Sequence, residues 1–470
     1  MARKGGKMKY VLKIAGIHFN ALQEHLYPGD GLEAVSVALC SRFCSDESTY
    51  FFVHKVQHIP YKDCTVRESA FLDWRTQIIQ PFLIEADKKN LSVLKIHSHP
   101  NGHSAFSETD NNSDLDLFRS VLGWTHEVNY HLSCVMLPDG KVFGRIINEK
   151  LKFLSLSKIS IIGDDIRVFN YSKIEKSKID KDLNERNLQT FGDGTVSLLA
   201  QMKIAVIGCS GTGSIVIEQL ARLGVGELVI VDPDKVEKKN LNRIINTTLS
   251  DAENKKYKVD VLKSAIASFG FNTKVTVYNK NLYDSKTAIR DIASSDAIFG
   301  CVDTVDGRHL INLMSSYYLL PYFDVGVRLD ADGKGGINAI NGSVHYIQPG
   351  RSSLLSRGVY TPEQLTSAGN LRKDPERYKS LLKEKYLKGV EVDSPAVISI
   401  NMFYSSMAVN DFLARIHPFR IQANKECAVQ RFVLSDPYFK NESADDIDPY
   451  FSKFVGRGDV YPLLGLPELS

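Results

Sequence analysis

The sequence predicts an α/β protein of two domains, an N-terminal α+β domain and a C-terminal doubly wound domain with a mainly parallel sheet. The chain has 470 residues, more than one ordinary hydrophobic core accommodates. Its N-terminal part contains short β-branched and aromatic runs separated by turns, which are strand signals. Its C-terminal part alternates strand-like runs with helical stretches around a glycine-rich loop, as a parallel sheet covered by helices requires.

The first predicted domain covers residues 1–163. Strands are expected at the runs EAVSVALC, YFFVHKV, LSVLKIH, YHLSCVMLP and KVFGRII, and the long amphipathic stretch 68–89 predicts a helix among them. Residues 164–184 turn polar and rich in charge, which predicts a linker with the start of a helix.

The second predicted domain covers residues 185–420. It opens with the buried-strand run KIAVIG, a glycine loop, a helix and the strand ELVIVD, and the runs VTVYN, AIFGCVD and YYLLPYFDVG continue the alternation. Dense charge in residues 361–388 predicts a solvated helical face, and another helix is expected at 398–415. Residues 421–470 show no periodicity, so no function is predicted for this C-terminal extension.

Composition and charge exclude several classes of protein. The chain is 43% hydrophobic and 24% charged, as globular proteins are, and a formal net charge of +3 is too small to predict a nucleic-acid partner. No apolar run approaches the roughly 20 residues that span a bilayer, and the N-terminus does not read as a signal peptide. Seven scattered cysteines without a C-x-x-C pair are typical of a reducing compartment. We therefore expect a cytoplasmic protein that binds neither nucleic acid nor membrane.

The segment HSHPNGHSAFSETD at residues 97–110 has the composition of a zinc site. His97 and His99 alternate along a strand and so share one of its faces, and Asp110 follows after a loop long enough to fold back. Two neutral imidazoles and a carboxylate suit Zn²⁺, and three protein ligands leave the fourth position to water, as in catalytic sites. Zinc lowers the pKa of that water to roughly 7, and a separate carboxylate must take up its proton.

This pattern, H-x-H-P followed after six residues by S-x-x-D, resembles the signature of the JAMM (JAB/MPN) metalloproteases, over about residues 10–160. The resemblance implies that His97, His99 and Asp110 ligate zinc. It also implies that Ser107 donates a hydrogen bond to the oxyanion of the tetrahedral intermediate. His103, inside the loop, is interpreted as incidental.

The same resemblance implies a catalytic glutamate upstream, on a strand that follows the first helix. Glu33 opens such a strand after the PGDG turn and is the predicted base. Glu24 on the preceding helix and Glu47 in the next loop are the alternatives.

The segment KIAVIGCSGTGSIVIEQLARLGVGELVIVD at residues 203–232 has the pattern of a nucleotide site. Gly208, Gly211 and Gly213 let backbone N–H groups approach phosphate oxygens at the N-terminus of a helix. Asp232 follows about 20 residues later, where a carboxylate can hold a ribose hydroxyl. Taken alone, this pattern is just as typical of a nicotinamide dehydrogenase.

Three further segments, DPDKVEKKNLNRIIN, YKVDVLKS and GCVDTVDGRHLIN, resemble the ThiF/MoeB/HesA adenylyltransferase superfamily, over about residues 185–420. The resemblance implies ATP and Mg²⁺ as cofactors. It implies that Asp232 binds the ribose and that Asp303 binds Mg²⁺. The residues that it implies for triphosphate binding are Asn240, Arg243 and Lys258. The chemistry agrees, because a carboxylate that attacks an α-phosphate needs cations on the leaving pyrophosphate and an acid that holds the metal.

Two further positions bear on that resemblance. Arg186, in NERNLQTFGDG, matches an arginine that superfamily members extend into the nucleotide site of a partner subunit, which implies a homodimer. Ser210 stands in the glycine loop where the superfamily usually has glycine. Serine fits there if its φ is negative.

The cysteines depart more clearly from the superfamily. Ser353 and Ser356 stand where many relatives carry a C-x-x-C zinc pair. No cysteine lies between Cys301 and Cys427, where thioester-forming relatives need one. Either the thioester step is absent, or Cys427 performs it, or a native cysteine has been replaced.

Both resemblances imply one substrate class, a ubiquitin-like protein with a flexible C-terminal glycine tail. The zinc domain would cleave the amide after that tail, and the other domain would adenylate the resulting carboxylate. Such fusions resemble components of bacterial ubiquitin-like conjugation systems, some associated with phage defence, with a ubiquitin-conjugating-type enzyme as a further partner. The alternative is activation of a sulfur-carrier protein in cofactor or metabolite biosynthesis. A third hypothesis is that one half only docks the tail.

Overall fold

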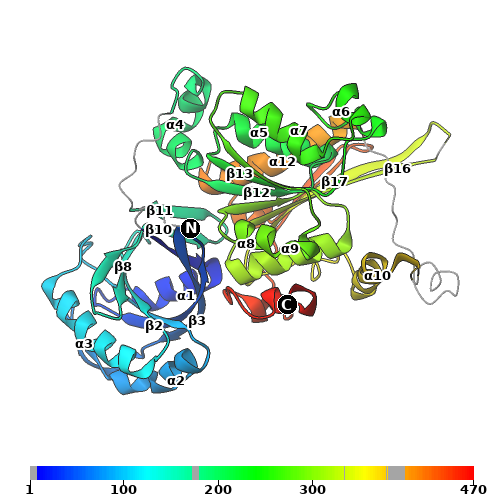
Figure 1. Ribbon diagram of the computed structural model, residues 1–470. Helices are drawn as coiled ribbons and strands as arrows, with labels where there is room; N and C mark the ends of the chain where they lie inside the picture. The colour runs from blue at the N-terminus through cyan, green and yellow to red at the C-terminus, as the bar shows by residue number, and fades with distance from the viewer. Residues whose placement is uncertain (1–7, 172–178, 333, 377, 379–396) are drawn as a thin grey trace. The chain divides into compact units, whose positions relative to one another are not determined.

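The computed structural model describes residues 8–171, 179–332, 334–376, 378 and 397–470. The chain divides into two compact units. The first consists of residues 1–173, 316–319 and 453–461, and the second consists of residues 174–315, 320–452 and 462–470. The predicted α/β two-domain class is confirmed, with an α+β first unit and a doubly wound second unit (Figure 1).

The first unit is built on a nine-stranded sheet with the order β11-β10-β1-β3-β2-β6-β7-β8-β9. Its pairs β1–β10, β1–β3 and β6–β7 are parallel, and the others are antiparallel. The strands are β1 (Lys9–Ala15), β2 (Val35–Cys44), β3 (Ser48–His58), β6 (Ser92–Ser98), β7 (Tyr130–Met136), β8 (Val142–Asn148), β9 (Phe153–Ser155), β10 (Lys158–Ile162) and β11 (Ile166–Asn170).

Two apolar cores lie on opposite faces of this sheet, because alternate residues of β2 and β6 point to opposite sides. Helix α1 (Gly16–Leu26) packs on one face through Phe19 and Leu22. Helices α2 (Gln80–Lys88) and α3 (Glu108–Trp124) pack on the other through residues such as Phe82 and Phe118.

The helix predicted over residues 68–89 is wrong in its first half. That half contains β5 (Leu72–Trp74), which pairs antiparallel with β4 (Cys64–Arg67) just before the stretch, and α2 begins only at Gln80. A proline at the start of α2 favours a helix that begins there, because a helix interior does not tolerate proline. In the segment 164–184, interpreted above as a linker, β11 pairs antiparallel with β10.

The second unit is built on an eight-stranded sheet with the order β14-β13-β12-β15-β16-β17-β18-β19. Its first five strands run parallel and the last three are joined by antiparallel pairings, which confirms the prediction of a doubly wound domain with a mainly parallel sheet. The strands are β12 (Lys203–Ile207), β13 (Glu227–Val231), β14 (Lys274–Tyr278), β15 (Ala297–Gly300), β16 (Tyr322–Ala331), β17 (Ile337–Ile347), β18 (Val429–Val433) and β19 (Tyr438–Glu442).

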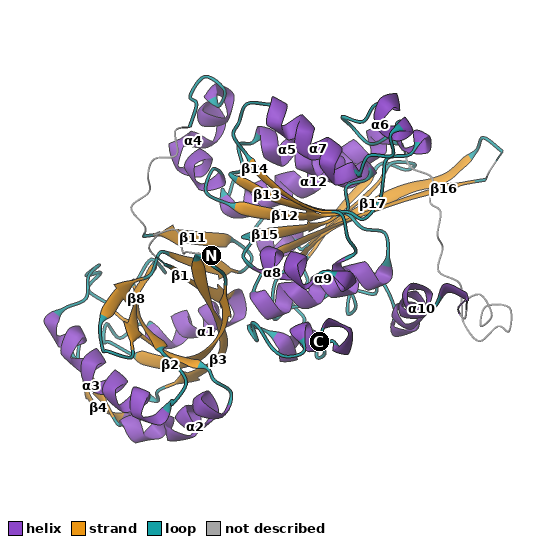
Figure 2. Ribbon diagram, viewed as in Figure 1, coloured by secondary structure: helices purple, strands orange, loops and turns teal. Residues whose placement is uncertain are grey.

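Helices cover both faces of this second sheet, with α5, α7 and α12 on one face and α8 and α9 on the other (Figure 2). The helices are α4 (Glu185–Leu199), α5 (Gly211–Arg222), α6 (Leu249–Glu253), α7 (Lys258–Ser268), α8 (Lys286–Ala293), α9 (Val305–Tyr318), α10 (Pro362–Lys373) and α12 (Ile398–Ile416). Part of the charged run at 361–388 lies outside the described residues. Among the described helices, none is long and apolar enough to cross a membrane.

The C-terminal extension contributes to both units. Strands β18 and β19 extend the eight-stranded sheet at its antiparallel edge. Residues 453–461 group with the first unit, and the last nine residues group with the second.

Candidate functional site

His97, His99 and Asp110 form a compact group in the first unit. His97 lies on β6, His99 follows that strand directly, and Asp110 lies in the first turn of α3. Asp110 Oδ1 is 2.9 Å from His97 Nε2, and Asp110 Oδ2 is 3.5 Å from His99 Nε2. The two Nε2 atoms are 3.2 Å apart, and one ligand atom from each residue lies within 4.8 Å of the others. The structure thus brings together the three residues that the sequence assigns to zinc.

The hydrogen bonds of this group favour a metal. His99 Nδ1 lies 2.7 Å from the backbone oxygen of His103 and donates to it, because a carbonyl can only accept. The lone pair of a neutral His99 is therefore on Nε2, the atom that faces Asp110 and His97. Burial also lowers the pKa of His97, which favours the neutral form of that imidazole. The donor set suits Zn²⁺. His103, interpreted from the sequence as incidental, contributes its backbone carbonyl.

Glu33 lies beside this group. In the register of β2 and β6, Val35 is opposite His97, so Glu33, two residues earlier, lies on the side where His99 follows β6. Its side chain is only 7% exposed, and burial raises its pKa to about 7. The two alternatives, Glu24 and Glu47, are exposed.

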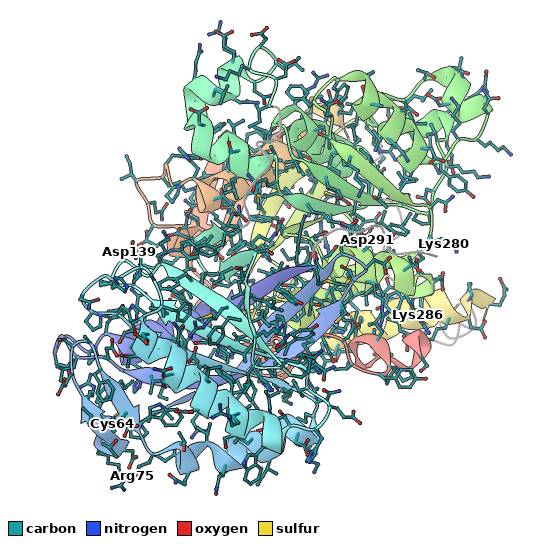
Figure 3. The ribbon with its side chains drawn as sticks, turned by 60° about the vertical axis from the view of Figure 1, so that its left-hand side comes forward. Cys64, Arg75, Asp139, Lys280, Lys286 and Asp291 are labelled. Atoms are coloured by element: carbon teal, nitrogen blue, oxygen red, sulfur yellow. The ribbon has the colours of Figure 1, made fainter. Side chains whose placement is uncertain are left out.

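The hairpin β4–β5, whose first residue Cys64 is labelled in Figure 3, holds the backbone of Glu33 on both sides. The N–H of Glu33 donates to the oxygen of Glu68 at 2.8 Å, and Arg67 Nε donates to the oxygen of Glu33 at 2.8 Å. Arg67 was not a sequence candidate. It ends β4, and only the partner strand β5 lies in the stretch that the periodicity assigned to a helix, so no sequence signal placed Arg67 beside Glu33.

Ser107 is the N-cap residue of α3 and forms a capping box with Asp110. Its hydroxyl and its backbone N–H each donate to Asp110 Oδ2 at 2.7 Å, and its Oγ accepts from the N–H of Asp110 at 3.0 Å. These bonds orient the carboxylate of Asp110. The predicted oxyanion contact of Ser107 stays a prediction.

In the second unit, three predicted residues lie at the same edge of the sheet. Gly208 follows β12, Asp232 follows β13 and Asp303 lies just beyond β15. These strands are adjacent and parallel, so their carboxyl ends meet at one edge. Open α/β sheets bind ligands at this edge.

The glycine loop leaves no space for side chains at two positions. Gly208 has φ +92°, and a Cβ there would lie 2.4 Å from the backbone oxygen of Cys301. A Cβ on Gly213 would lie 1.8 Å from the oxygen of Gly208. A Cβ on Gly211 would instead meet the side chain of Asn401 at 2.2 Å. Ser210 has φ −91°, which confirms that serine fits this loop.

Asp232 and Lys258 are both buried beside this loop. Asp232 Oδ2 accepts from the N–H of Cys209 at 2.7 Å, and its Oδ1 accepts from the N–H of Asp234 at 2.9 Å. Lys258 Nζ lies 3.8 Å from Asp232 Oδ1 and donates to Asp234 Oδ2 at 2.7 Å. Burial raises the pKa of Asp232, and the nearby Lys258 opposes this effect.

The other predicted nucleotide residues differ in their surroundings. Asn240 is buried and accepts from the N–H of Glu237 at 3.0 Å. The Cδ atom of Arg243 lies 3.5 Å from a Cβ built on Gly211, so Arg243 lies next to the glycine loop. Asp303 is exposed.

Arg186 forms a side-chain hydrogen bond within its own helix. It is exposed on α4, and its Nη1 donates to Gln189 Oε1 at 2.8 Å. Its role in the nucleotide site of a partner subunit stays a prediction.

The cysteines of the second unit are Cys209, Cys301 and Cys427, and all three are buried. Cys427 is 2% exposed, and burial raises its pKa. A buried thiol of raised pKa is a poor nucleophile. In this conformation Cys427 therefore does not present the thiolate that a thioester step needs.

Two family models match the chain. The model of the ThiF family matches residues 184–412, and the model of prokaryotic homologs of the JAB domain matches residues 17–141. Among curated proteins, the chain is similar to the ubiquitin-like modifier-activating enzyme 5 of Culex quinquefasciatus and to that of Aedes aegypti, each at 30% identity over 166 residues. These matches cover 34% of this chain and 40% of each relative, so the chain spans about two fifths of their length.

Among solved structures, the chain is similar to E. coli MccB with ATP, at 16% identity and a TM-score of 0.43, over 58% of this chain and 74% of that chain. It is also similar to the microcin C7 biosynthetic enzyme MccB in complex with N-formylated MccA, at 17% identity and a TM-score of 0.45, over 58% and 75%. The family matches show that this chain joins a JAB domain of the prokaryotic type, in its N-terminal part, to a ThiF domain in its C-terminal part.

Proposed function

We propose that this chain uses ATP to adenylate the C-terminal glycine carboxylate of a ubiquitin-like protein and processes the same C-terminus at a zinc-dependent peptidase or isopeptidase site. The observation that carries the proposal is the presence in one chain of two sites, the His97–His99–Asp110 group beside Glu33 and the glycine loop beside Asp232. The similarity to ubiquitin-like modifier-activating enzymes supports this substrate class.

In the first unit, His97, His99 and Asp110 would hold zinc, which when bound supplies Lewis acidity to a water and to the scissile carbonyl. Glu33 would accept a proton from the attacking water and return it to the leaving amine. Its pKa of about 7 supports this role, because a carboxyl of that pKa exchanges protons near neutral pH. A bond from the water oxygen to the carbonyl carbon forms, and the amide C–N bond breaks.

In the second unit, an oxygen of the glycine carboxylate would attack the α-phosphorus of ATP, and pyrophosphate would leave. Asp232 would hold the ribose, and the backbone of the glycine loop would approach the phosphates. Asn240, Arg243 and Lys258 would neutralise the leaving pyrophosphate, and Asp303 would hold Mg²⁺. The location of Gly208, Asp232 and Asp303 at one sheet edge supports these assignments.

The proposal includes a homodimer, in which Arg186 reaches the nucleotide site of the partner subunit. The exposure of Arg186 on α4 is compatible with that role. We place the protein in a bacterial ubiquitin-like conjugation system, with an antiphage role, in which a ubiquitin-conjugating-type enzyme accepts the activated tail. The match to prokaryotic JAB homologs supports a bacterial setting.

A second candidate function is activation of a sulfur-carrier protein. One observation favours it, the burial of all three cysteines of the second unit, Cys209, Cys301 and Cys427. Without an exposed thiol in the second unit, the acyl-adenylate would pass directly to a sulfur donor rather than through an enzyme thioester. A conjugating enzyme encoded next to this protein favours the first function, and a sulfurtransferase favours the second.

ATP–pyrophosphate exchange in the presence of a ubiquitin-like protein that ends in glycine tests the adenylation half. We expect exchange with the wild-type protein and its loss in Asp303→Ala. No exchange by the wild-type protein with any such substrate would refute adenylation. Intact mass spectrometry of the enzyme distinguishes the two candidates, because a thioester adds the mass of the substrate to the chain.

Cleavage of a tail-extended precursor tests the peptidase half. We expect Glu33→Gln to lower the rate by about 100-fold or more, the size typical of a lost general base, and to retain zinc. The matched variant Glu24→Gln, which changes an exposed glutamate on α1, is expected to cleave at the wild-type rate. Cleavage by Glu33→Gln at the wild-type rate would contradict the assignment of the base.

A further inference from the structure

A second group of charged residues is buried in the first unit, next to the proposed zinc ligands. It consists of Lys95 on β6, Asp114 on α3 and Arg145 on β8, which are 4%, 0% and 7% exposed. Lys95 Nζ donates to Asp114 Oδ1 at 2.8 Å, and Arg145 Nη2 donates to Asp114 Oδ2 at 2.7 Å. Removing such charges from water is costly, and apolar side chains of similar volume often stabilise a fold as well or better. The fold alone therefore gives no reason for this group.

The register of α3 on β6 relates the two groups. Lys95, His97 and His99 alternate along the chain, so their side chains lie on the face that α3 covers. Asp110 and Asp114 are four residues apart, about 6 Å along the helix, and two residues of a strand span nearly the same distance. Asp110 therefore contacts His97. One turn later on the helix, Asp114 contacts Lys95, which lies two residues earlier on the strand.

The buried side chains in the N-terminal half of α3 are both acidic. The buried side chains of this helix are, in chain order, Asp110, Asp114, Leu117, Phe118 and Val121. Apolar packing thus begins only after Asp114. The two carboxylates are what the first turns of the helix bury against the sheet.

Arg145 extends this anchoring to Asp110 itself. Its Nη2 donates to the backbone oxygen of Asp110 at 3.3 Å, and its Nη1 donates to Asn111 Oδ1 at 2.5 Å. Its guanidinium carbon lies 3.8 Å from the ring centroids of both Phe106 and Phe153, so the guanidinium has little freedom to move. A guanidinium held in this way fixes the first turn of α3.

We propose that Asp114 is a positioning residue for zinc binding. With Lys95 and Arg145 it sets the register of α3 on β6, so that the carboxylate of Asp110 is held between the two imidazoles before the metal arrives. This inference rests on the proposed zinc site. It predicts that Asp114 affects zinc affinity beyond its effect on folding.

Zinc affinity, measured by competition with a chromophoric chelator on the full chain, tests this proposal. We expect Asp114→Asn to weaken zinc binding about 10- to 100-fold, the range typical of residues that support metal ligands. The visible spectrum of the Co²⁺-substituted protein is expected to change as the carboxylate of Asp110 moves. Asp116→Asn, which removes the same charge from an exposed position of α3, is expected to leave both measurements unchanged.

Val121→Ala controls for stability, because it opens a cavity farther along α3 and leaves the charged group intact. If Val121→Ala weakened zinc binding as much as Asp114→Asn, the role of Asp114 would be structural only and the proposal would be overturned. Wild-type zinc affinity in Asp114→Asn would overturn it as well. A wild-type protein that bound no zinc would instead refute the zinc site on which it rests.

If Asp114→Asn does not fold, a triple variant with Lys95→Met, Asp114→Leu and Arg145→Met replaces the three charges by apolar side chains of similar size. Apolar replacement of a buried charged group often keeps or raises the stability of a fold. We expect a folded triple variant with weakened zinc binding. Wild-type affinity in that variant would overturn the proposal.

Discussion

Arg67 Nε donates a hydrogen bond to the backbone oxygen of Glu33 at 2.8 Å. The guanidinium of Arg67 is itself held, because its Nη1 lies 2.5 Å from Asp30 Oδ2 and its Cζ lies 4.2 Å from the ring centroid of Tyr61. The hairpin β4–β5 therefore positions the residue that we propose as the base, without contributing to the zinc ligands.

The first prediction follows from this contact. We expect Arg67→Ala to lower the turnover of tail cleavage by about 10- to 100-fold, because a small displacement of a base from its reacting atom is costly. Zinc affinity is expected to stay unchanged, since Arg67 contacts no ligand in the proposed set. Asp30→Asn, which leaves the bond to Glu33 in place, is expected to have the smaller effect. Equal losses in the two variants would contradict positioning of Glu33 through its backbone.

The second prediction concerns the glycine loop. A Cβ on Gly213 would lie 1.8 Å from the oxygen of Gly208, so the loop must move in Gly213→Ala. Overpacking of this kind costs about 1–3 kcal/mol, which corresponds to a loss of ATP affinity of about 5- to 150-fold if the bound loop bears the cost. Isothermal titration with ATP measures it. Gly369→Ala on α10, where a Cβ meets nothing within 4 Å, is expected to bind ATP as the wild type does.

The third prediction concerns acid stability and His131, which is fully buried in the first unit. Its Nδ1 accepts from the N–H of Val93 at 3.1 Å, and its Nε2–H donates to Thr125 Oγ1 at 3.2 Å. Burial lowers the pKa of His131 to about 3, so its ring stays neutral in the folded state down to low pH. In the unfolded state the same ring becomes protonated below about pH 6.5. The contribution of this neutral ring to the free energy of unfolding is fully present above pH 6.5 and is lost as the pH falls toward 3.

His131→Gln keeps both hydrogen-bonding roles without a titrating group. From pH 8 to pH 5 we expect the wild-type first unit to lose about 2 kcal/mol more stability than this variant. Urea unfolding followed by tryptophan fluorescence measures the difference, because the two tryptophans of the chain, Trp74 and Trp124, both lie in the first unit. Parallel pH dependence of the two proteins would contradict a depressed pKa of His131.

Much of the fold follows from local patterns. The run EAVSVALC predicts β2 and KIAVIG predicts β12, because alternation or continuous apolar character is a property of adjacent residues. The metal group was also predictable, since His97, His99 and Asp110 lie within 14 residues and the spacing contains the strand and the return loop.

The supporting residues were not predictable in this way. Asp114 reads as one acid among several on a polar helix, and Arg145 reads as a charge interrupting a strand. Their pairing depends on how β6, β8 and α3 come together, which no local pattern contains. The prediction for the stretch 68–89 failed for the opposite reason, since its amphipathic pattern indicated one helix. Its first half instead contains β5, which pairs with the strand that ends at Arg67, and the helix begins only at Gln80.

Ser353 Oγ donates to Asp448 Oδ2. Ser353 is one of the two serines at the positions where the resemblance to the superfamily implies a cysteine pair. Asp448 is buried, and its Oδ1 also accepts from the N–H groups of Tyr450 at 2.7 Å and Phe451 at 3.1 Å. Ser353 Oγ further accepts from the N–H of Leu355 at 3.0 Å. In this chain a hydrogen-bonded serine and aspartate thus join the C-terminal extension to the second unit.

The last prediction tests that connection. Asp448→Ala removes the acceptor of the Ser353 hydroxyl and of two backbone N–H groups, and each buried group left without a partner costs about 1–3 kcal/mol. We expect hydrogen exchange, followed by mass spectrometry, to accelerate at least tenfold in peptides that contain residues 350–357 and 448–452. Asp446→Ala changes an exposed carboxylate two residues away and is expected to exchange as the wild type does. Unchanged exchange in Asp448→Ala would show that the extension is held by its apolar contacts instead, because Phe451 is also buried.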